Sequence, residues 1–408
     1  MTDRLSELYS ISNEKKRIQP MEGLRGFAVL LVFMVHFQAL LGHLAAEHHQ
    51  VWTVFSFLGD IGNTGVDFFF VLSGFLVYGA LLKRKGASTF TFIRRRIERI
   101  YPTFLVVFAI YLALSASFRA ENKIHGPPAS AVIYIVQNLL LLPGIFSIPP
   151  IITVAWSLSY EFFFYLLIPA ILLVTQLPRW NRTGRVLFFV GVWITYIIYA
   201  FTVPHSQVRL LMFVSGILLY EIIESGWLEN RLTAKGEAIA TLAFVVSLFL
   251  IYLIDAKPAW FSLLPGFSAG RTILPGIMTY QGPYKVILLS VTAPIFVLFS
   301  FQYDGTLQSI FRWNPIRYLG NMSYSYYLIH GLALQAVTMG ASLLFPNTHR
   351  SLPLFFILFP LGFIGTWMAS TILFLFVEKP LSFRQKATDA QKATDAAGTR
   401  KPSAVSAN

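Results

Sequence analysis

Residues Leu24–Phe37 read LRGFAVLLVFMVHF, an apolar run with one arginine near its start and one histidine near its end. The run extends to residues 23–41, close to the roughly 20 residues that an α-helix needs to cross a bilayer. Comparable runs recur along the chain and predict about ten transmembrane helices. Their expected limits are 23–41, 60–82, 100–118, 155–177, 186–203, 208–225, 236–254, 284–301, 318–345 and 352–377.

Composition indicates the same class of protein. The 408 residues are 55% hydrophobic and only 12% charged, which is about half of the charged share usual in soluble proteins. Such a chain cannot supply a charged surface, so lipid is its expected solvent and an all-α, polytopic membrane helix bundle is its expected fold. Cysteine is absent, which excludes disulfides, thiolate nucleophiles and thiolate metal sites.

The positive charge is distributed as in a membrane protein. The net charge is +13, and the lysines and arginines lie in short blocks between the apolar runs. With the N-terminus inside, the inner segments hold 24 of them and the outer segments hold six. This asymmetry predicts that both termini are cytoplasmic. It explains the basic charge without nucleic acid, so we expect lipid and no nucleic acid as a partner.

Three parts can be distinguished along the chain. Residues 1–20 are a polar cytoplasmic segment, residues 21–381 form the membrane domain, and residues 382–408 form a polar tail that we expect to be disordered. Within the outer segment 119–154, the apolar stretch Val132–Leu142 is too short to span comfortably. We interpret it as re-entrant or interfacial.

Ionisable side chains inside spans are costly, so the few present are candidates for function. Arg25 and His36 are eleven residues apart, which on an α-helix is three turns plus about 20°, so both should point the same way. Their rise along the axis is about 16 Å. The simpler interpretation is an arginine that extends to the interface and an unrelated, hydrogen-bonded histidine.

Two carboxylates also lie in predicted spans. Asp67, in GVDFFFVLSGF, could orient an imidazole or accept from a substrate hydroxyl, or it could be a favourable charge at a helix N-terminus. Glu161, in AWSLSYEFFFY, must be either paired or protonated. A structural hydrogen bond between helices and a catalytic role are both open for Glu161.

Arginines cluster before the third span, at Arg94, Arg95, Arg96 and Arg99. Membrane topology alone explains their charge. It does not explain why Arg96 and Arg99 share a helix face as an i, i+3 pair, which would suit phosphate binding.

A polar stripe opens the ninth predicted span. Ser323, Tyr327 and His330 are spaced i, i+4 and i+7, so they could contact substrate or make hydrogen bonds between helices. His48 and His49 lie in an outer loop without a third ligand at suitable spacing, and no metal site is predicted.

Together and in this order, these segments resemble the integral-membrane acyltransferase family 3. That family includes bacterial O-acetyltransferases of surface glycans and acyltransferases of macrolides. The resemblance runs from about Leu24 to Pro380 and is similar to the stand-alone type without an added extracytoplasmic domain. The matching motifs are Arg25 and His36 with ten residues between them, GVDFFFVLSGF, Arg96 and Arg99 before Tyr101-Pro102, WSLSYEFFFY with Glu161, LGNMSYSYYLIH, and FVEKP with Glu378.

This resemblance implies an O-acyltransferase, most often an O-acetyltransferase, in the inner membrane of a bacterium. It implies acetyl-CoA or another acyl-CoA as co-substrate, no tightly bound cofactor, and a carbohydrate acceptor such as envelope polysaccharide or lipopolysaccharide. His36 would act as general base or take the acyl group itself, and Asp67 or Glu161 would hold its tautomer. The residues expected to bind the nucleotide are Arg25, Arg96 and Arg99.

A transporter or flippase of a lipid-linked saccharide is the main alternative, because it too would need charges inside the membrane. Inverted internal repeats would favour it, and none is evident in the sequence. A glycosyltransferase that uses lipid-linked sugars would need acidic residues clustered near the first span. Residues 42–58 offer only Glu47. Consumption of a thioester would distinguish these classes.

Overall fold

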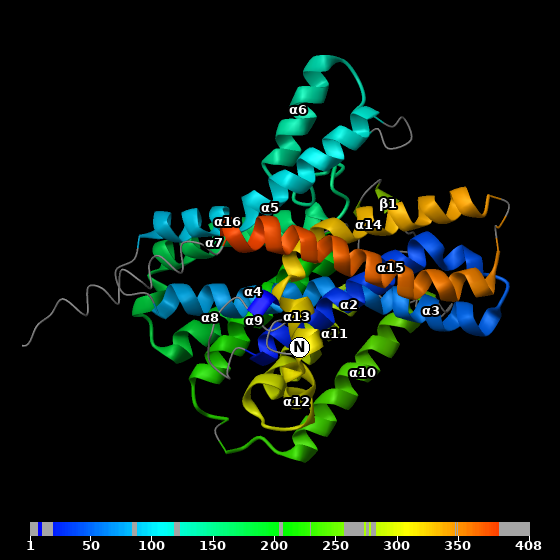
Figure 1. The fold of residues 1–408 in the computed structure, drawn as a ribbon. Helices are drawn as coiled ribbons and strands as arrows, with labels where there is room; N and C mark the ends of the chain where they lie inside the picture. The colour runs from blue at the N-terminus through cyan, green and yellow to red at the C-terminus, as the bar shows by residue number, and fades with distance from the viewer. Residues whose placement is uncertain are drawn as a thin grey trace, which may run out of the picture.

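The computed structural model describes residues 7–9, 19–83, 88–117, 123–203, 207–228, 230–256, 273–274, 277–278, 283–346, 348 and 350–382. The chain forms a bundle of α-helices, most of them aligned along one direction (Figure 1). Within these residues, nine helices are long and apolar enough to cross a membrane. The structure therefore confirms the predicted all-α, polytopic architecture.

The spans are built from long helices and their short extensions. They are α2 (Gln19–Leu41) with η1 (Gly42–Ala45), α3 (His49–Gly62) continued by α4 (Thr64–Lys83), α5 (Thr89–Ser117), α7 (Ala155–Thr175), α8 (Arg182–Thr202), α10 (Ala234–Ala256), α11 (Pro283–Gln302), α14 (Ser323–Leu344), and α15 (Leu352–Leu373) with the π-helical turn η6 (Phe374–Glu378) and α16 (Lys379–Ser382). The shorter elements are α6 (Pro128–Leu139), η3 (Leu177–Arg179), η4 (Val208–Leu210), α9 (Leu211–Glu224), α12 (Thr306–Arg312), α13 (Asn314–Asn321), and the antiparallel strands β1 (Ile273–Leu274) and β2 (Ile277–Met278).

Two predicted segments differ in the structure. The predicted sixth span, 208–225, corresponds to η4 and α9, and α9 has 14 residues, fewer than the roughly 20 that cross a bilayer. Most of its side chains are nevertheless buried, since it packs against α4, α8 and α11. The predicted outer loop 42–58 is mostly helical, because α3 begins at His49 and leads into α4.

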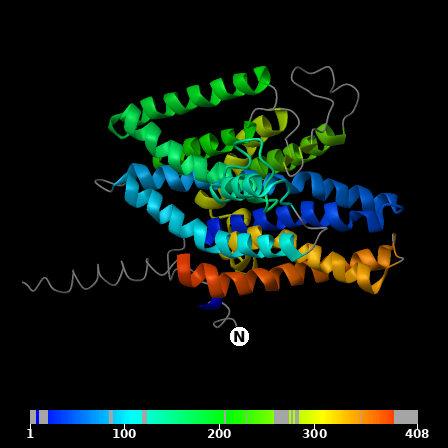
Figure 2. The ribbon, with the colours of Figure 1, turned by 90° about the horizontal axis from the view of Figure 1, so that it is seen from above.

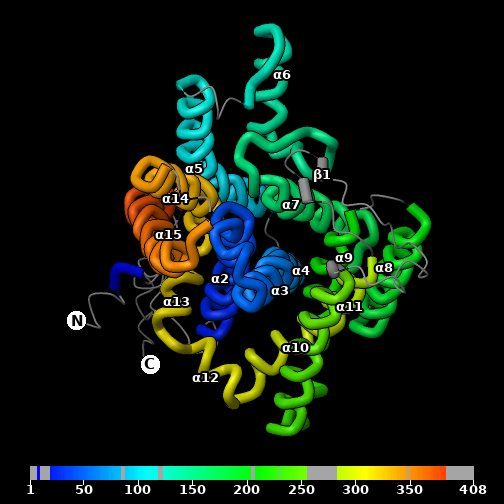
Figure 3. The backbone as a smooth tube through the Cα atoms, turned by 90° about the vertical axis from the view of Figure 1, so that its right-hand side faces the viewer, coloured from blue at the N-terminus to red at the C-terminus, as the bar shows by residue number. Residues whose placement is uncertain are grey.

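Figures 2 and 3 show that α2 and α4 occupy the middle of the bundle. In Figure 2 the orange and red helices α14 and α15 lie along one edge and the green helix α8 lies along the opposite edge. Figure 3 looks along the long helices and shows the same order, with α5, α6 and α7 on a third side. The residues of α2 and α4 are thus surrounded by protein.

Glycines let the central helices approach through their backbones. A Cβ added to Gly74 of α4 would lie 2.1 Å from the carbonyl oxygen of Phe213, and one added to Gly216 of α9 would lie 2.1 Å from that of Val71. Each of these two glycines therefore faces the backbone of the other helix. Contacts between small residues are a common way for helices to associate in lipid.

Glycines also let α13 and α4 approach the backbone of α2 closely. A Cβ on Gly320 of α13 would lie 1.7 Å from the carbonyl oxygen of Glu22, and one on Gly65 of α4 would lie 2.4 Å from that of Ala28. Since Glu22 and Ala28 flank Arg25, these contacts fix the stretch of α2 that carries this arginine.

The outer helices present apolar side chains to the surroundings. Leu187 of α8 is 65% exposed and Leu242 of α10 is 63% exposed, which suits contact with lipid. The 12-residue α6 also exposes Val132 and Ile133 and projects from the bundle beside the end of α5 (Figure 1). Its length confirms that the stretch around 132–142 is too short to span.

Candidate active site

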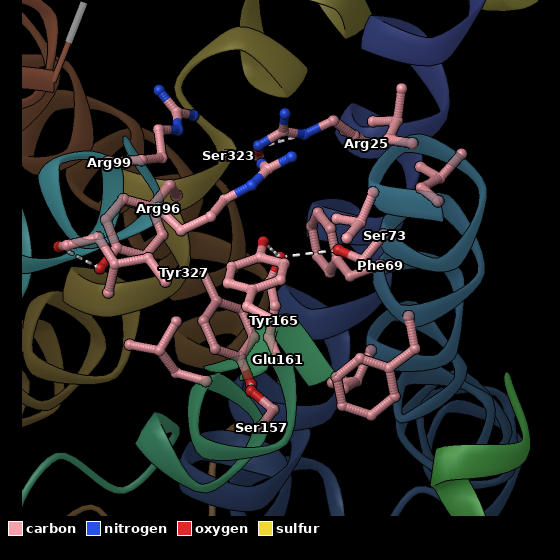
Figure 4. A pocket seen from close by; sticks show the side chains of 18 residues that line it. Arg25, Phe69, Ser73, Arg96, Arg99, Ser157, Glu161, Tyr165, Ser323 and Tyr327 are labelled. Carbon is pink, nitrogen blue, oxygen red and sulfur yellow. Dashed lines mark hydrogen bonds between the residues drawn. The ribbon is translucent and has the colours of Figure 1, made fainter. Parts of the chain in front are cut away.

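A pocket opens among α2, α4, α5, α7 and α14. It holds about 890 Å³ of empty space, including the part open to solvent. Figure 4 shows the side chains that line it. Its polar residues are Arg25, Ser73, Arg96, Arg99, Ser157, Glu161, Tyr165, Ser323, Tyr324 and Tyr327. Of the predicted site residues, His36, Asp67 and His330 do not line this pocket.

Arg25 and Arg96 reach the pocket without a carboxylate partner among the described residues. Arg25 Nε donates to Ser323 Oγ at 3.1 Å, and the guanidinium of Arg96 lies 4.9 Å from the ring centre of Tyr165. Figure 4 shows both arginines directed toward the same region of the pocket, beside Ser323. Two half-buried guanidinium groups that reach one pocket, neither of them held in an ion pair among the described residues, favour an anionic ligand.

Arg99 differs, because a buried carboxylate holds it. Its Nη2 lies 3.0 Å from Oε1 of Glu378, whose side chain is fully buried. Oε2 of Glu378 accepts from the backbone N–H of Ser325 at 3.0 Å and from the Ser325 hydroxyl at 2.6 Å. Glu378 ends the π-helical turn η6, a feature found frequently at functional sites. Part of the charge of Arg99 is therefore neutralised within the protein.

Glu161 lies in the pocket and joins two helices. One of its oxygens accepts from Ser73 Oγ of α4 at 2.7 Å and also from the hydroxyl of Tyr165, one turn along α7. This geometry is the hydrogen bond between helices that was one of the two interpretations of Glu161. Because Tyr165 also contacts Arg96, the carboxylate lies close to the cationic part of the pocket.

His36 and His330 meet outside the pocket. Their ring centres are 4.5 Å apart and the rings are nearly perpendicular, at 82°. Since Arg25 contacts Ser323 of α14 and His36 contacts His330 of α14, the two residues of α2 face the same helix, as their spacing predicted. Two residues of the polar stripe on α14, Ser323 and His330, therefore face α2.

A backbone carbonyl sets the tautomer of His36. Its Nδ1 lies 2.9 Å from the carbonyl oxygen of Val32, one turn earlier. A carbonyl can only accept, so Nδ1 carries the proton and Nε2 of the neutral ring carries the lone pair. Asp67 and Glu161, which were expected to hold this tautomer, contact other residues in the structure, and a helix carbonyl lies at Nδ1 instead.

Asp67 forms its ion pair elsewhere. Its Oδ1 lies 3.8 Å from Nε of Arg209, and both side chains are almost completely buried. The guanidinium of Arg209 also lies 4.9 Å from the ring centre of Trp156. Asp67 therefore joins α4 to η4, the short helix before α9.

Tyr327 touches both the pocket and the histidine pair. It lines the pocket, where its hydroxyl lies 2.7 Å from Ser157 Oγ and donates to the carbonyl of Val154 at 3.2 Å. Its ring centre is 5.8 Å from that of His330. Tyr327 thus lies where the cationic pocket approaches His36.

Some residues of the site were not identified from the sequence. Tyr165 could have been, because it lies four residues after Glu161 on the same helix face. Ser73 could not, because its partner Glu161 is on another helix. The sequence places Arg209 at the start of a predicted span, but it could not show that Asp67 of another helix is its partner. Within the described part of the chain, no group of three or more His, Cys, Asp or Glu side chains could hold a metal ion.

Comparisons with known proteins match this chain to acyltransferases. A family model described as an acyltransferase domain matches residues 19–373. The peptidoglycan O-acetyltransferase OatA of Listeria monocytogenes is 24% identical over 395 residues, which cover 90% of this chain and 56% of OatA. The acyltransferase MdmB of Streptomyces mycarofaciens is 38% identical over 157 residues, which cover 38% of each chain. The chain thus spans about half the length, or less, of these relatives, and no solved structure matches it.

Proposed function

This chain belongs to the acyltransferase family whose domain matches residues 19–373, and from that premise we propose that it transfers an acyl group from acyl-CoA to a carbohydrate hydroxyl at the bacterial inner membrane. The relative OatA is named an O-acetyltransferase, so acetyl-CoA is the proposed donor. The observation that carries the proposal is the pair Arg25 and Arg96, which reach one pocket without a carboxylate partner among the described residues.

The donor is proposed to bind by its phosphates. Guanidinium groups bind phosphate with paired hydrogen bonds, and Arg25 and Arg96 are available for this, with the hydroxyl of Ser323 beside Arg25. Arg99 would add charge from a position held by Glu378. The pantetheine arm would then extend from the arginines toward His36, which lies about 16 Å farther along α2.

Transfer is proposed to occur at His36. Its Nε2 holds the lone pair because the carbonyl of Val32 occupies Nδ1, so it can take the proton of the acceptor hydroxyl as that oxygen attacks the thioester carbonyl. The same lone pair could instead receive the acyl group. Glu161 and Asp67 bond to other residues, so we propose that they support the site through their helices.

The acceptor is proposed to be a hydroxyl of an envelope glycan. OatA carries peptidoglycan in its name, and lipopolysaccharide and other envelope polysaccharides offer the same chemistry.

The first experiment measures thiol release from acetyl-CoA by the protein purified in detergent, with peptidoglycan fragments and other envelope glycans as acceptors. His36→Ala should lower kcat by about 10²–10⁴-fold, as expected for loss of a general base. Arg96→Ala should raise KM for acetyl-CoA by about 10- to 100-fold, the effect of losing one charge-assisted hydrogen bond.

Arg94→Ala is the matched control. Arg94 lies two residues before Arg96, but it is exposed and pairs with Glu98 on the same helix, so its loss should leave both constants unchanged. Each variant must elute and melt like the parent protein. Release of no thiol from any acyl-CoA with any of these acceptors would exclude the proposed reaction and favour a saccharide flippase.

A further inference from the structure

The contact between His36 and His330 joins α14 to α2 outside the pocket. His330 has no exposed surface, and its Nδ1 lies 2.8 Å from the carbonyl of Tyr327 and 3.2 Å from that of Tyr326. Both carbonyls can only accept, so Nδ1 is the donor and Nε2 of the neutral ring carries a lone pair. Both histidines therefore share one tautomer.

The remaining nitrogen of His330 lacks a hydrogen-bond partner. Its Nε2 is buried and makes no hydrogen bond within the described part of the chain. A buried acceptor without a partner is unfavourable and calls for an explanation. The nearest ring is that of His36, with the centres 4.5 Å apart. When His36 is neutral, its Nδ1–H is already bonded to Val32, so it gives His330 little to accept.

The situation changes when His36 gains a proton. An imidazolium at this distance can be stabilised by the lone pair of its neighbour, because a hydrogen bond from a charged donor is stronger than one from a neutral donor. No carboxylate bonds to His36 among the described residues, so this stabilisation has no ionic competitor there. Two imidazolium ions so close in apolar surroundings would repel each other, so only one ring carries the charge at a time.

We propose that His330 is a positioning residue for His36, which holds its ring and stabilises the positive charge that His36 acquires during acyl transfer. This rests on the proposed function. The acceptor hydroxyl gives its proton to Nε2 of His36 while its oxygen bonds to the thioester carbonyl carbon. The carbon–sulfur bond then breaks, and the departing sulfur takes the proton from His36, so the ester and the free thiol leave and His36 is neutral again.

Two substitutions separate this role from packing. His330→Gln places an amide near the position of Nε2 but lacks the ring, whereas His330→Phe keeps the ring and lacks the lone pair. If the lone pair matters, Gln should retain activity within about 10-fold and Phe should lower kcat by about 100-fold, with KM for acetyl-CoA unchanged within about twofold. If Phe is as active as the parent or more active than Gln, His330 only fills space and the proposal is overturned.

A second measurement does not need enzymatic activity. Diethylpyrocarbonate acylates imidazole nitrogens, and mass spectrometry of the peptides gives the rate at each histidine. His36 should react about 10-fold more slowly in His330→Phe than in the parent, with Gln between them, because the attacking nitrogen becomes positive. His48 and His49, which are exposed, serve as internal references that should not change.

The two measurements distinguish the possible failures. A parent protein that consumes no thioester but shows the predicted order of His36 reactivity would remove the proposed function and keep the contact of the two histidines. Acyl transfer with equal His36 reactivity in all variants would keep the function and remove the role of His330.

Discussion

The two arginines that line the pocket from α5 have different partners, so the protein holds them in different ways. Arg96 and Arg99 are three residues apart on α5, yet Arg96 packs on the ring of Tyr165 while Arg99 meets the buried Glu378. The i, i+3 spacing predicted that both would lie on one face, and both do line the pocket. It could not predict that a carboxylate 279 residues later neutralises one of them.

The pair of Arg99 and Glu378 should be important for stability. Glu378→Ala removes the carboxylate from Arg99, whose side chain is 22% exposed, so it should lower the free energy of unfolding by about 3 kcal/mol, the lower end of the range for buried ion pairs. Glu98→Ala, which breaks the exposed pair with Arg94, should cost about 0.5 kcal/mol. Thermal unfolding in detergent measures both. If Glu378→Ala melted no lower than Glu98→Ala, the buried pair would not stabilise the fold.

At the scale of elements, the central helices are positioned by backbone contact. Hydropathy predicted where α4 and its neighbours lie along the chain, because a span is recognised by its apolar length. It could not show that α9 is too short to be a full span, nor that Gly74 and Gly216 face each other's helix. Those contacts depend on how two helices are paired, which local sequence does not specify.

A larger side chain at the contact of α4 and α9 should separate the helices. Gly216→Leu would place its Cβ 2.1 Å from the carbonyl oxygen of Val71, so we expect loss of most folded protein, since overpacking costs at least about 1–3 kcal/mol. Gly191→Leu is the control, because a Cβ there meets nothing within 4 Å. The yield of monodisperse protein on size exclusion measures the effect. Equal yields would show that the two helices can move apart.

The short helix α12 should depend on a carboxylate from α10. Glu237 accepts from the backbone N–H of Leu307 at 2.6 Å and from that of Thr306 at 3.2 Å, so it caps the first turn of α12. Glu237→Gln, which keeps the shape but not the charge, should cost about 1 kcal/mol of unfolding free energy. A melting temperature equal to that of the parent in Glu237→Gln would show that charge is unimportant at this cap.

At the scale of the whole molecule, composition and charge distribution were sufficient to predict an all-α membrane bundle. The structure agrees in class and in nearly every span. Only some of the predicted site residues lie together in the structure. Arg25, Arg96, Arg99 and Glu161 line one pocket, whereas His36 and Asp67 lie outside it. The sequence motifs identify candidate residues, but they give no information about the distances between the helices that carry them.

The orientation in the membrane can be tested with single cysteines, since the chain has none of its own. Ala46 follows η1, the extension of α2, and Ser309 lies in α12; both are exposed. A membrane-impermeant maleimide should label Ala46→Cys in intact cells and Ser309→Cys only after permeabilisation, because the positive segments are expected inside. The reverse pattern would invert the topology and place the arginine pocket on the wrong side for cytosolic acyl-CoA.

The glycine contacts around α2 and α4 also bear on how this chain can evolve. Where two helix backbones touch, any side chain larger than that of glycine would clash with the neighbouring backbone. We therefore expect these glycines to be retained during evolution, even though they touch no substrate. A saturation library scored for growth would therefore show Gly65 and Gly320 to be as intolerant as His36. Sensitivity to mutation alone would therefore not distinguish the residues that pack the helices from the residues that act in catalysis.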